Sequence, residues 1–218
     1  MMSSFFDKRS IPMRILTTLC NLIFVNICFI IGCIPILTIG ASVTSLYKVT
    51  IKIAAGENPS VFREFFGCFK ENFIRSTGFF IVYCLLAAFF GFEIYMVRTS
   101  FSQDLQWAMY PAIFFLFAIF SSSAYAFPLI GWFDETVKQL IKNSLLLAIT
   151  NLPTTILYAA VLFGVGFALV ANPTSYWIAF SILIFMGFGI IALLFSFFLK
   201  RIFEKHGAVI TPEEEITG

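Results

Sequence analysis

Two lysines stand out as the residues of this chain best suited to bind another molecule. Lys48 and Lys52 share one face of the segment 41–55 with Ser45, while apolar side chains occupy the other face. Side chains four residues apart are neighbours on a helix. Two ammonium groups placed in this way attract anionic groups, such as lipid headgroups, an acidic solute or an acidic partner. If any residues of the chain bind a ligand, we expect these two to do so.

Other polar side chains interrupt long apolar runs. Amide and carboxyl groups in a membrane need partners, so they either join helices or line a solute path. Glu93 lies five residues before Arg98, which favours an ion pair at the membrane surface over a role in coupling to protons or cations. The residues to which these alternatives apply are Asn21, Asn26, Glu93 and Asn151.

Catalysis and metal binding are not expected. The chain has one histidine, His206, and five cysteines without a CxxC pair. This composition argues against His-based zinc sites and most His-based catalysis, and it suggests that the cysteines are small apolar side chains. The sequence contains neither a nucleophile–base motif nor a phosphate-binding glycine loop. We therefore predict that the protein is not an enzyme and uses no cofactor or metal.

The composition indicates a membrane protein. Of the 218 residues, 60% are hydrophobic and 12% are charged, and the mean hydropathy is +0.94. A soluble domain of this size has too little interior to bury so much apolar surface. The net charge of +2 gives no reason to expect a nucleic-acid partner. The lipid bilayer is the expected surrounding.

Five long apolar runs predict membrane-spanning helices. A helix needs about 20 apolar residues to cross a bilayer, and continuously apolar runs favour helices over strands. We therefore expect an all-α, polytopic membrane protein. The runs cover residues 15–37, 73–97, 107–132, 145–171 and 176–199.

Between the first two runs, the segment 60–73 has the pattern of an amphipathic helix. Its phenylalanines fall on one face at helical spacing, and its charged residues fall elsewhere. This pattern predicts a helix lying in the headgroup region and leading into the second span. A partner protein could dock there, and the residues that we assign to this docking face are Phe62, Phe65, Phe69, Lys70 and Asn72.

Pro35 and Gly40 break the chain after the first span. The segment 41–55 that follows is about 22 Å long as a helix, which is short for a crossing. If it returns through the membrane from a cytoplasmic N-terminus, only Arg98 of the 14 Lys and Arg residues lies outside, as the positive-inside rule favours. This threading places Lys48 deep in the membrane, at a cost of about 2.5–3.5 kcal/mol. The alternative is five spans with the N-terminus outside.

These segments predict one integral membrane domain over residues 1–218. Two helical hairpins in the same orientation form its second part, with a kink at Pro153. The divisions are a cytoplasmic N-terminus (1–14), a span with its Pro/Gly turn and short helix (15–57), the surface helix and first hairpin (58–135), the second hairpin (136–205) and a cytoplasmic tail (206–218).

Most of the chain resembles the YesL-like family of bacterial integral membrane proteins, and the first 75 residues are the specific part of the resemblance. The family pattern combines P-x-x-T-x-G, a short helix with Leu-Tyr, a nearby acidic residue and F-x-x-F-K-x-N-F. The matching positions are Pro35, Thr38, Gly40, Leu46, Tyr47, Glu57, Phe66, Phe69, Lys70, Asn72 and Phe73. The resemblance implies a bacterial plasma-membrane protein, often encoded beside carbohydrate ABC importers, whose molecular activity is unknown.

Two functions follow as hypotheses. The first is an accessory or regulatory partner of a carbohydrate-uptake system, which would contact ABC importer permease subunits. The second is a small-solute transporter or a substrate-binding membrane subunit, suggested by the Pro35–Gly40 break and the deep Lys48. Self-association is compatible with either hypothesis.

Overall fold

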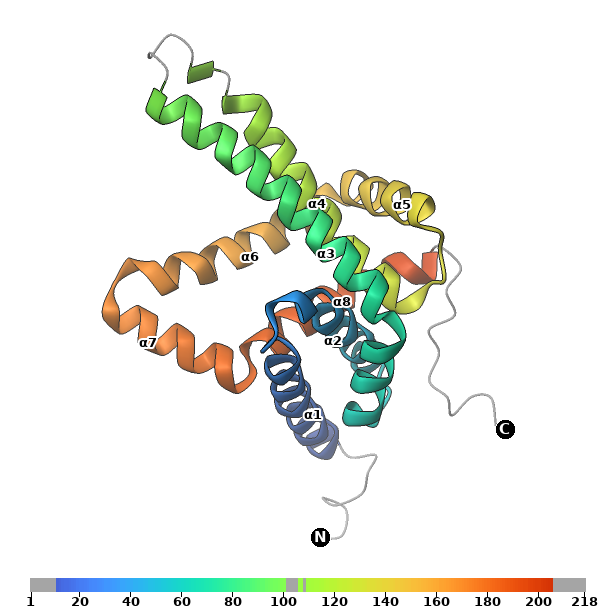
Figure 1. The fold of residues 1–218 in the computed structure, drawn as a ribbon. Helices are drawn as coiled ribbons and strands as arrows, with labels where there is room; N and C mark the ends of the chain where they lie inside the picture. The colour runs from blue at the N-terminus through green and yellow to red at the C-terminus, as the bar shows by residue number, and fades with distance from the viewer. Residues whose placement is uncertain (1–10, 101–105, 108, 206–218) are drawn as a thin grey trace, which may run out of the picture.

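The computed structural model describes residues 11–100, 106–107 and 109–205, and the chain is helical there, with no strand in these ranges (Figure 1). This confirms the predicted all-α fold. The elements are α1 (Ile11–Gly32), the 3-10 turn η1 (Ile36–Thr38), α2 (Ile39–Ala54), α3 (Val61–Ser100), α4 (Met109–Trp132), α5 (Val137–Thr150), α6 (Leu152–Ala171), α7 (Pro173–Ile182), the π-helical segment η3 (Leu183–Gly187) and α8 (Phe188–Lys205).

The described part of the chain has six helical segments that are long and apolar enough to cross a membrane. Five of them correspond to the predicted long spans, and the sixth is the short segment after the Pro/Gly break. The chain therefore has the make-up of a multi-pass membrane protein. The six segments are Ile15–Gly32, Ile36–Ala54, Val61–Thr99, Met109–Trp132, Leu152–Ala171 and Pro173–Lys205.

The short helix α2 lies at the centre of the fold, packed against α1, α3, α4 and α8. It is the most buried of the six segments, with 67% of its window inside the protein. The turn before it is closed by Thr38, whose Oγ1 lies 2.6 Å from both Gly32 O and Pro35 O. At its other end, Gly56 adopts φ 88°, a left-handed conformation that favours glycine and ends the helix.

Gly40 allows α2 to pack closely on α3. A Cβ atom at this position would lie 2.5 Å from the backbone oxygen of Ser76 and 2.7 Å from the Cβ of Phe80. Contacts this short are forbidden, so only glycine permits the observed spacing. The predicted break at Pro35 and Gly40 therefore serves two purposes: it turns the chain, and it lets the returning helix pack against α3.

The segment 60–73 is the beginning of α3 rather than a separate surface helix. α3 runs without interruption for 40 residues, a length of about 60 Å. Phe65 is fully buried in the core, and Phe66 and Phe69 pack against that core. These three phenylalanines thus pack within the protein, because α2 packs against α3, whereas Phe62 and Phe73 are exposed.

The predicted fourth span is broken. Residues 145–150 belong to α5, and α6 begins at Leu152 after Asn151, whose φ of −116° and ψ of 39° are not helical. Pro153 in the first turn of α6 explains the break, since proline lacks an N–H and clashes with the carbonyl four residues earlier. The fifth span is interrupted as well, by η3 between α7 and α8.

The two predicted hairpins diverge from a common body. Figure 1 shows the α3–α4 hairpin reaching to the upper left of the view and the α6–α7 hairpin reaching to the left. The side-chain contacts between α4 and α6 involve the first turns of α6: Tyr125 meets Thr155 at 3.0 Å, and Phe120 stacks on Tyr158. Beyond this point the hairpins separate.

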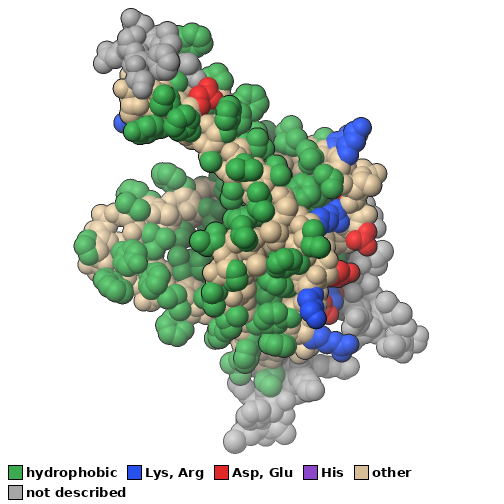
Figure 2. Space-filling model, viewed as in Figure 1, with side chains coloured by type: hydrophobic (Ala, Val, Ile, Leu, Met, Phe, Trp, Pro, Cys, Tyr) green, Lys and Arg blue, Asp and Glu red, His purple; other side chains and the backbone are tan. Residues whose placement is uncertain are grey.

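Charged side chains gather along one edge of the face shown in Figure 2. Figure 2 shows Lys, Arg, Asp and Glu gathered along the right-hand edge of this face, while hydrophobic side chains cover most of the rest. A few charged side chains lie near the far end of the α3–α4 hairpin, where α3 carries Glu93 and Arg98. This separation of charge from apolar surface is typical of helices that cross a bilayer.

Candidate functional site

Lys48 points into the protein. Its Nζ donates a hydrogen bond to the backbone oxygen of Gly131 at 2.7 Å and lies 4.7 Å from the centroid of the Trp132 ring. A cation over an indole face is attracted by the ring quadrupole, more strongly where water is excluded. Lys48 thereby joins the middle of α2 to the end of α4, and it is only partly accessible to a ligand.

Lys52, one turn further along α2, pairs with α3. Its Nζ lies 3.0 Å from Glu64 Oε1, and the two side chains are 18% and 32% exposed. Such a half-exposed ion pair stabilises by at most about 1 kcal/mol. The two lysines that we predicted to bind a ligand are therefore engaged with Gly131, Trp132 and Glu64 of their own chain.

A second set of polar contacts adjoins the end of α4. The Arg75 guanidinium of α3 donates to the backbone oxygen of Glu135, and Asn143 Nδ2 of α5 donates to Glu135 Oε1 at 2.6 Å. Two atoms here are buried without a hydrogen-bond partner in the described part of the protein, Glu135 Oε2 and Trp132 Nε1. We call the whole group the lysine cluster: Lys48, Lys52, Glu64, Arg75, Trp132, Glu135 and Asn143.

The lysine cluster has the chemistry of a polar anchor. Its members come from α2, α3, the end of α4, the following loop and α5. Sequence reasoning found the two lysines but missed Glu135, which is linked to α3 across 60 residues.

The predicted docking face is smaller than expected. Phe65 and Asn72 are buried and Phe69 is half-buried, whereas Phe62 and Lys70 are exposed. The Asn72 amide bonds within its own helix, with Nδ2 3.2 Å from Cys68 O and 3.6 Å from its Sγ. Phe62 and Lys70 are the members of this set that a partner can reach.

The two asparagines of α1, Asn21 and Asn26, bond different parts of the protein. Asn21 Nδ2 donates to Asn58 Oδ1 at 2.9 Å and so ties α1 to the loop before α3. Asn26 is fully buried and bonds the backbone of η3 and of α8: its Nδ2 lies 3.1 Å from Leu183 O and 2.7 Å from Ile184 O, and its Oδ1 accepts from Gly189 N at 3.1 Å. Asn26 thus makes the helix-joining contact that a polar group in lipid requires, whereas Asn21 joins its helix to a loop.

The remaining predicted residues are not brought together with these. Asn151 lies at the α5–α6 break, where its Nδ2 donates to Leu147 O at 3.1 Å. Glu93 lies half-exposed in the outer part of α3, and within the described residues it forms no ion pair with Arg98. The structure therefore separates the six polar candidates into the lysine cluster, two α1 contacts, one helix junction and one residue near the tip of a hairpin.

A set of buried hydroxyl contacts was missed by the sequence analysis. The pairs link helices across the protein at 2.8–3.0 Å, and they include the chain from Tyr83 through Ser122 to Ser144. Their only sequence signal is a Ser, Thr or Tyr within an apolar run. The other pairs are Thr44 with Ser76, Tyr47 with Tyr158, Thr50 with Ser196, and Tyr125 with Thr155.

Comparison with known proteins gives one match. A family model described as "Protein of unknown function, DUF624" matches residues 19–94. No curated protein and no solved structure matches the chain. The matched region contains most of α1, the whole of α2 and most of α3, so it includes Lys48, Lys52 and the close approach at Gly40. The similarity is therefore to a family without an assigned activity.

Proposed function

We propose that this protein is a non-enzymatic accessory or regulatory subunit of a bacterial plasma-membrane assembly, with both termini in the cytoplasm. The observation that carries this choice is the placement of Lys48, which bonds Gly131 O and lies over Trp132. A transporter in which this lysine lines the solute path would need it free, whereas an accessory subunit needs it only to hold α2 and α4 together.

We further propose that the assembly is a carbohydrate-uptake system. This step rests on the resemblance of residues 21–73 to the YesL-like family, whose members are often encoded beside carbohydrate ABC importers. The fold supports a lateral partner in the membrane, because α3 and α6 are each only 6% buried over their apolar windows. Faces of this kind contact either lipid or the helices of another subunit.

In-cell photocrosslinking tests this proposal. A photoreactive residue replaces Phe163 on the exposed side of α6, or Phe62 at the start of α3, in the native bacterium growing on a complex polysaccharide. We expect permease subunits of a carbohydrate importer to be captured and identified by mass spectrometry. Capture of this chain alone would instead indicate self-association and contradict the proposal. A photoreactive residue at the buried Phe65 serves as the control that captures nothing external.

A small-solute transporter is the second candidate. Both halves of the second hairpin are discontinuous, one at Asn151 and the other at Leu183–Gly187. Broken helices are typical of transporter binding sites. Reconstituted protein that takes up a sugar or an organic acid into liposomes would favour this function. In that case, Lys48→Met should reduce uptake more than Lys52→Met does.

The orientation has its own test. The gathering of charge along one edge of the face shown in Figure 2 supports placing that edge in the cytoplasm. With Cys20 and Cys84, which are exposed, replaced by serine, a membrane-impermeant maleimide should fail to label Ser4→Cys in intact cells and should label it after lysis. Labelling in intact cells would place the N-terminus outside.

A further inference from the structure

The α6–α7 hairpin is attached to the rest of the protein through two interruptions of its helices. We call residues 152–182 the arm. At one end, Asn151 separates the arm from α5, and at the other the π-helical segment Leu183–Gly187 separates it from α8. A π-helical turn interrupts the regular hydrogen bonding of the α-helix, and such turns occur frequently at functional sites. The arm thus begins and ends at a joint.

A buried hydroxyl holds the first joint. Thr155 is fully buried, and its Oγ1 lies 3.0 Å from Tyr125 Oη of α4. The same oxygen lies 3.2 Å from Ala148 O and 3.1 Å from Asn151 O, two carbonyls at the end of α5. The break in the helix therefore does not leave these groups without partners, which would be costly in a membrane.

Asn26 holds the second joint from outside the arm. It belongs to α1, more than 150 residues away, yet its amide bonds Leu183 O, Ile184 O and Gly189 N. These are backbone groups of η3 and of the first turn of α8. The irregular geometry of η3 is thus stabilised by one side chain of another helix, and that side chain is fully buried.

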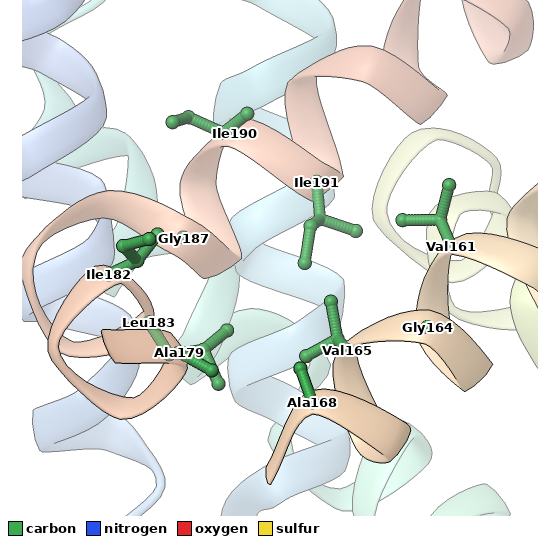
Figure 3. Close-up of a pocket in the computed structure, with 10 residues that line it drawn as sticks. All are labelled: Val161, Gly164, Val165, Ala168, Ala179, Ile182, Leu183, Gly187, Ile190 and Ile191. Atoms are coloured by element: carbon green, nitrogen blue, oxygen red, sulfur yellow. The ribbon is translucent and has the colours of Figure 1, made fainter. Parts of the chain in front are cut away.

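Between the joints the arm borders an apolar cleft of about 360 Å³. Figure 3 shows Val165 of α6 and Ile191 of α8 pointing toward each other across it. Two residues of the second joint, Leu183 and Gly187, also line the cleft, so a rotation at that joint changes its width. The remaining lining residues are Val161, Gly164, Ala168, Ala179, Ile182 and Ile190.

We propose that the arm pivots about these two joints and so opens and closes the cleft between α6 and α8. In this proposal the hydrogen bonds of Asn26 restrain rotation at the second joint, and we call Asn26 the latch. The body around α2 stays fixed during this movement, because it is held by many contacts between α1, α2, α3, α4 and α8. Interrupted helices of this kind are where domains and hairpins hinge. This inference does not depend on the accessory or transport function proposed above.

Electron-spin distance measurements test the latch. The five cysteines are replaced by alanine or serine, and the protein is reconstituted in nanodiscs of phosphatidylcholine and phosphatidylglycerol. Spin labels are attached at Phe163 of the arm and Leu85 of α3, which are 78% and 65% exposed. A reference pair within the body joins Leu85 to Phe24 of α1, which is also exposed.

We expect the arm pair to give a broader distance distribution than the reference pair. Asn26→Leu should move the mean arm distance by about 5 Å, the rise of one helical turn, or add a second peak, without altering the reference pair. The matched control is Asn21→Leu, in the same helix, whose side chain bonds Asn58 rather than the arm. It should leave both distributions unchanged.

The proposal is overturned if Asn26→Leu and Asn21→Leu give the same arm distribution. Should Asn26→Leu not yield a folded protein, Thr155→Val decides instead, because it removes only the hydroxyl of the first joint and keeps its volume. An arm distribution as narrow as the reference in the otherwise unaltered protein, and unchanged by Thr155→Val, would also overturn the proposal.

Discussion

The two helical hairpins have similar lengths of chain but different architectures. In the first, α3 runs unbroken from Val61 to Ser100 and packs along α4. In the second, both halves of the helical hairpin are divided. One half consists of α5 and α6, and the other consists of α7, η3 and α8. A few residues make this difference, namely Asn151, Pro153 and the η3 segment that Asn26 binds.

The comparison shows how rigidity is distributed. The first hairpin is anchored to α2 by a glycine contact, a lysine cluster and the hydroxyl pair Thr44–Ser76. In the second hairpin, α5 and α8 pack against the body, whereas the part between them, α6 and α7, is anchored near its base, at Thr155, Tyr158 and η3. Substitutions near α2 should therefore affect the stability of the whole protein, and comparable substitutions in the arm should not.

The largest effect is expected for Gly40→Ala. The new Cβ would lie 2.5 Å from the Ser76 oxygen, a backbone atom that cannot yield without moving α3. We expect a loss of about 2–3 kcal/mol in the free energy of unfolding, measured by thermal or denaturant unfolding in detergent. Gly164→Ala in the arm is the matched control: nothing lies within 4 Å of its Cβ position, so stability should stay the same or rise slightly. Equal losses at both glycines would remove the distinction between the hairpins.

Lys48→Met should have the next largest effect. Methionine keeps most of the volume but loses the bond to Gly131 O and the contact with Trp132. We expect a loss of about 1–2 kcal/mol, together with a change in Trp fluorescence. Lys48→Arg retains a charged donor and should be less destabilising. A stabilised Lys48→Met protein would mean that the desolvation of the ammonium group outweighs its contacts.

Pro153→Ala tests whether α5 and α6 are two separate helices or one helix with a kink. A proline in the middle of a helix costs about 3 kcal/mol, so its replacement would stabilise a continuous helix strongly. Here Pro153 stands in the first turn of α6, a position where the missing N–H costs little. We therefore expect a change below about 1 kcal/mol. A large gain in stability would show that α5 and α6 are strained parts of one helix.

The smallest effect is expected for Lys52→Gln, which removes the half-exposed pair with Glu64. The loss should be about 0.5 kcal/mol and should shrink as the salt concentration rises. The double variant with Glu64→Gln completes a mutant cycle, and its coupling energy should vanish at high salt. A coupling above about 2 kcal/mol would place the pair in a drier environment than its exposure indicates.

Much of this fold can be predicted from the sequence, because length and hydropathy alone indicate helices that cross a membrane. The turn at Pro35 could also be predicted, since proline acts through local backbone sterics; at Pro153 the sequence predicted a kink in one span, and the structure has two helices, α5 and α6. The match to a family model of unknown function covers residues 19–94 and adds no activity.

The position of α2 could not be predicted in this way. Its moderate polarity is compatible with a surface helix, a re-entrant helix or a central one, and only the neighbours decide. The phenylalanines of α3 illustrate the same ambiguity, because a periodic apolar face can contact lipid or another helix. Asn26 and η3 are further cases: the contact spans 157 residues, and no local pattern marks either partner.

The burial of α2 has a consequence for how the protein is made. Its window has a mean hydropathy of 1.3, the lowest of the six, and Ser42, Thr44, Ser45 and Thr50 are all buried on it. The hydroxyl of Thr50 pairs with Ser196 in α8, a helix that the ribosome synthesises last among those described. α2 therefore obtains this neighbour only after α8 has been synthesised, since Ser196 follows Thr50 by 146 residues. Until then, a weakly hydrophobic segment must be held in the membrane by α1, α3 and α4 without α8.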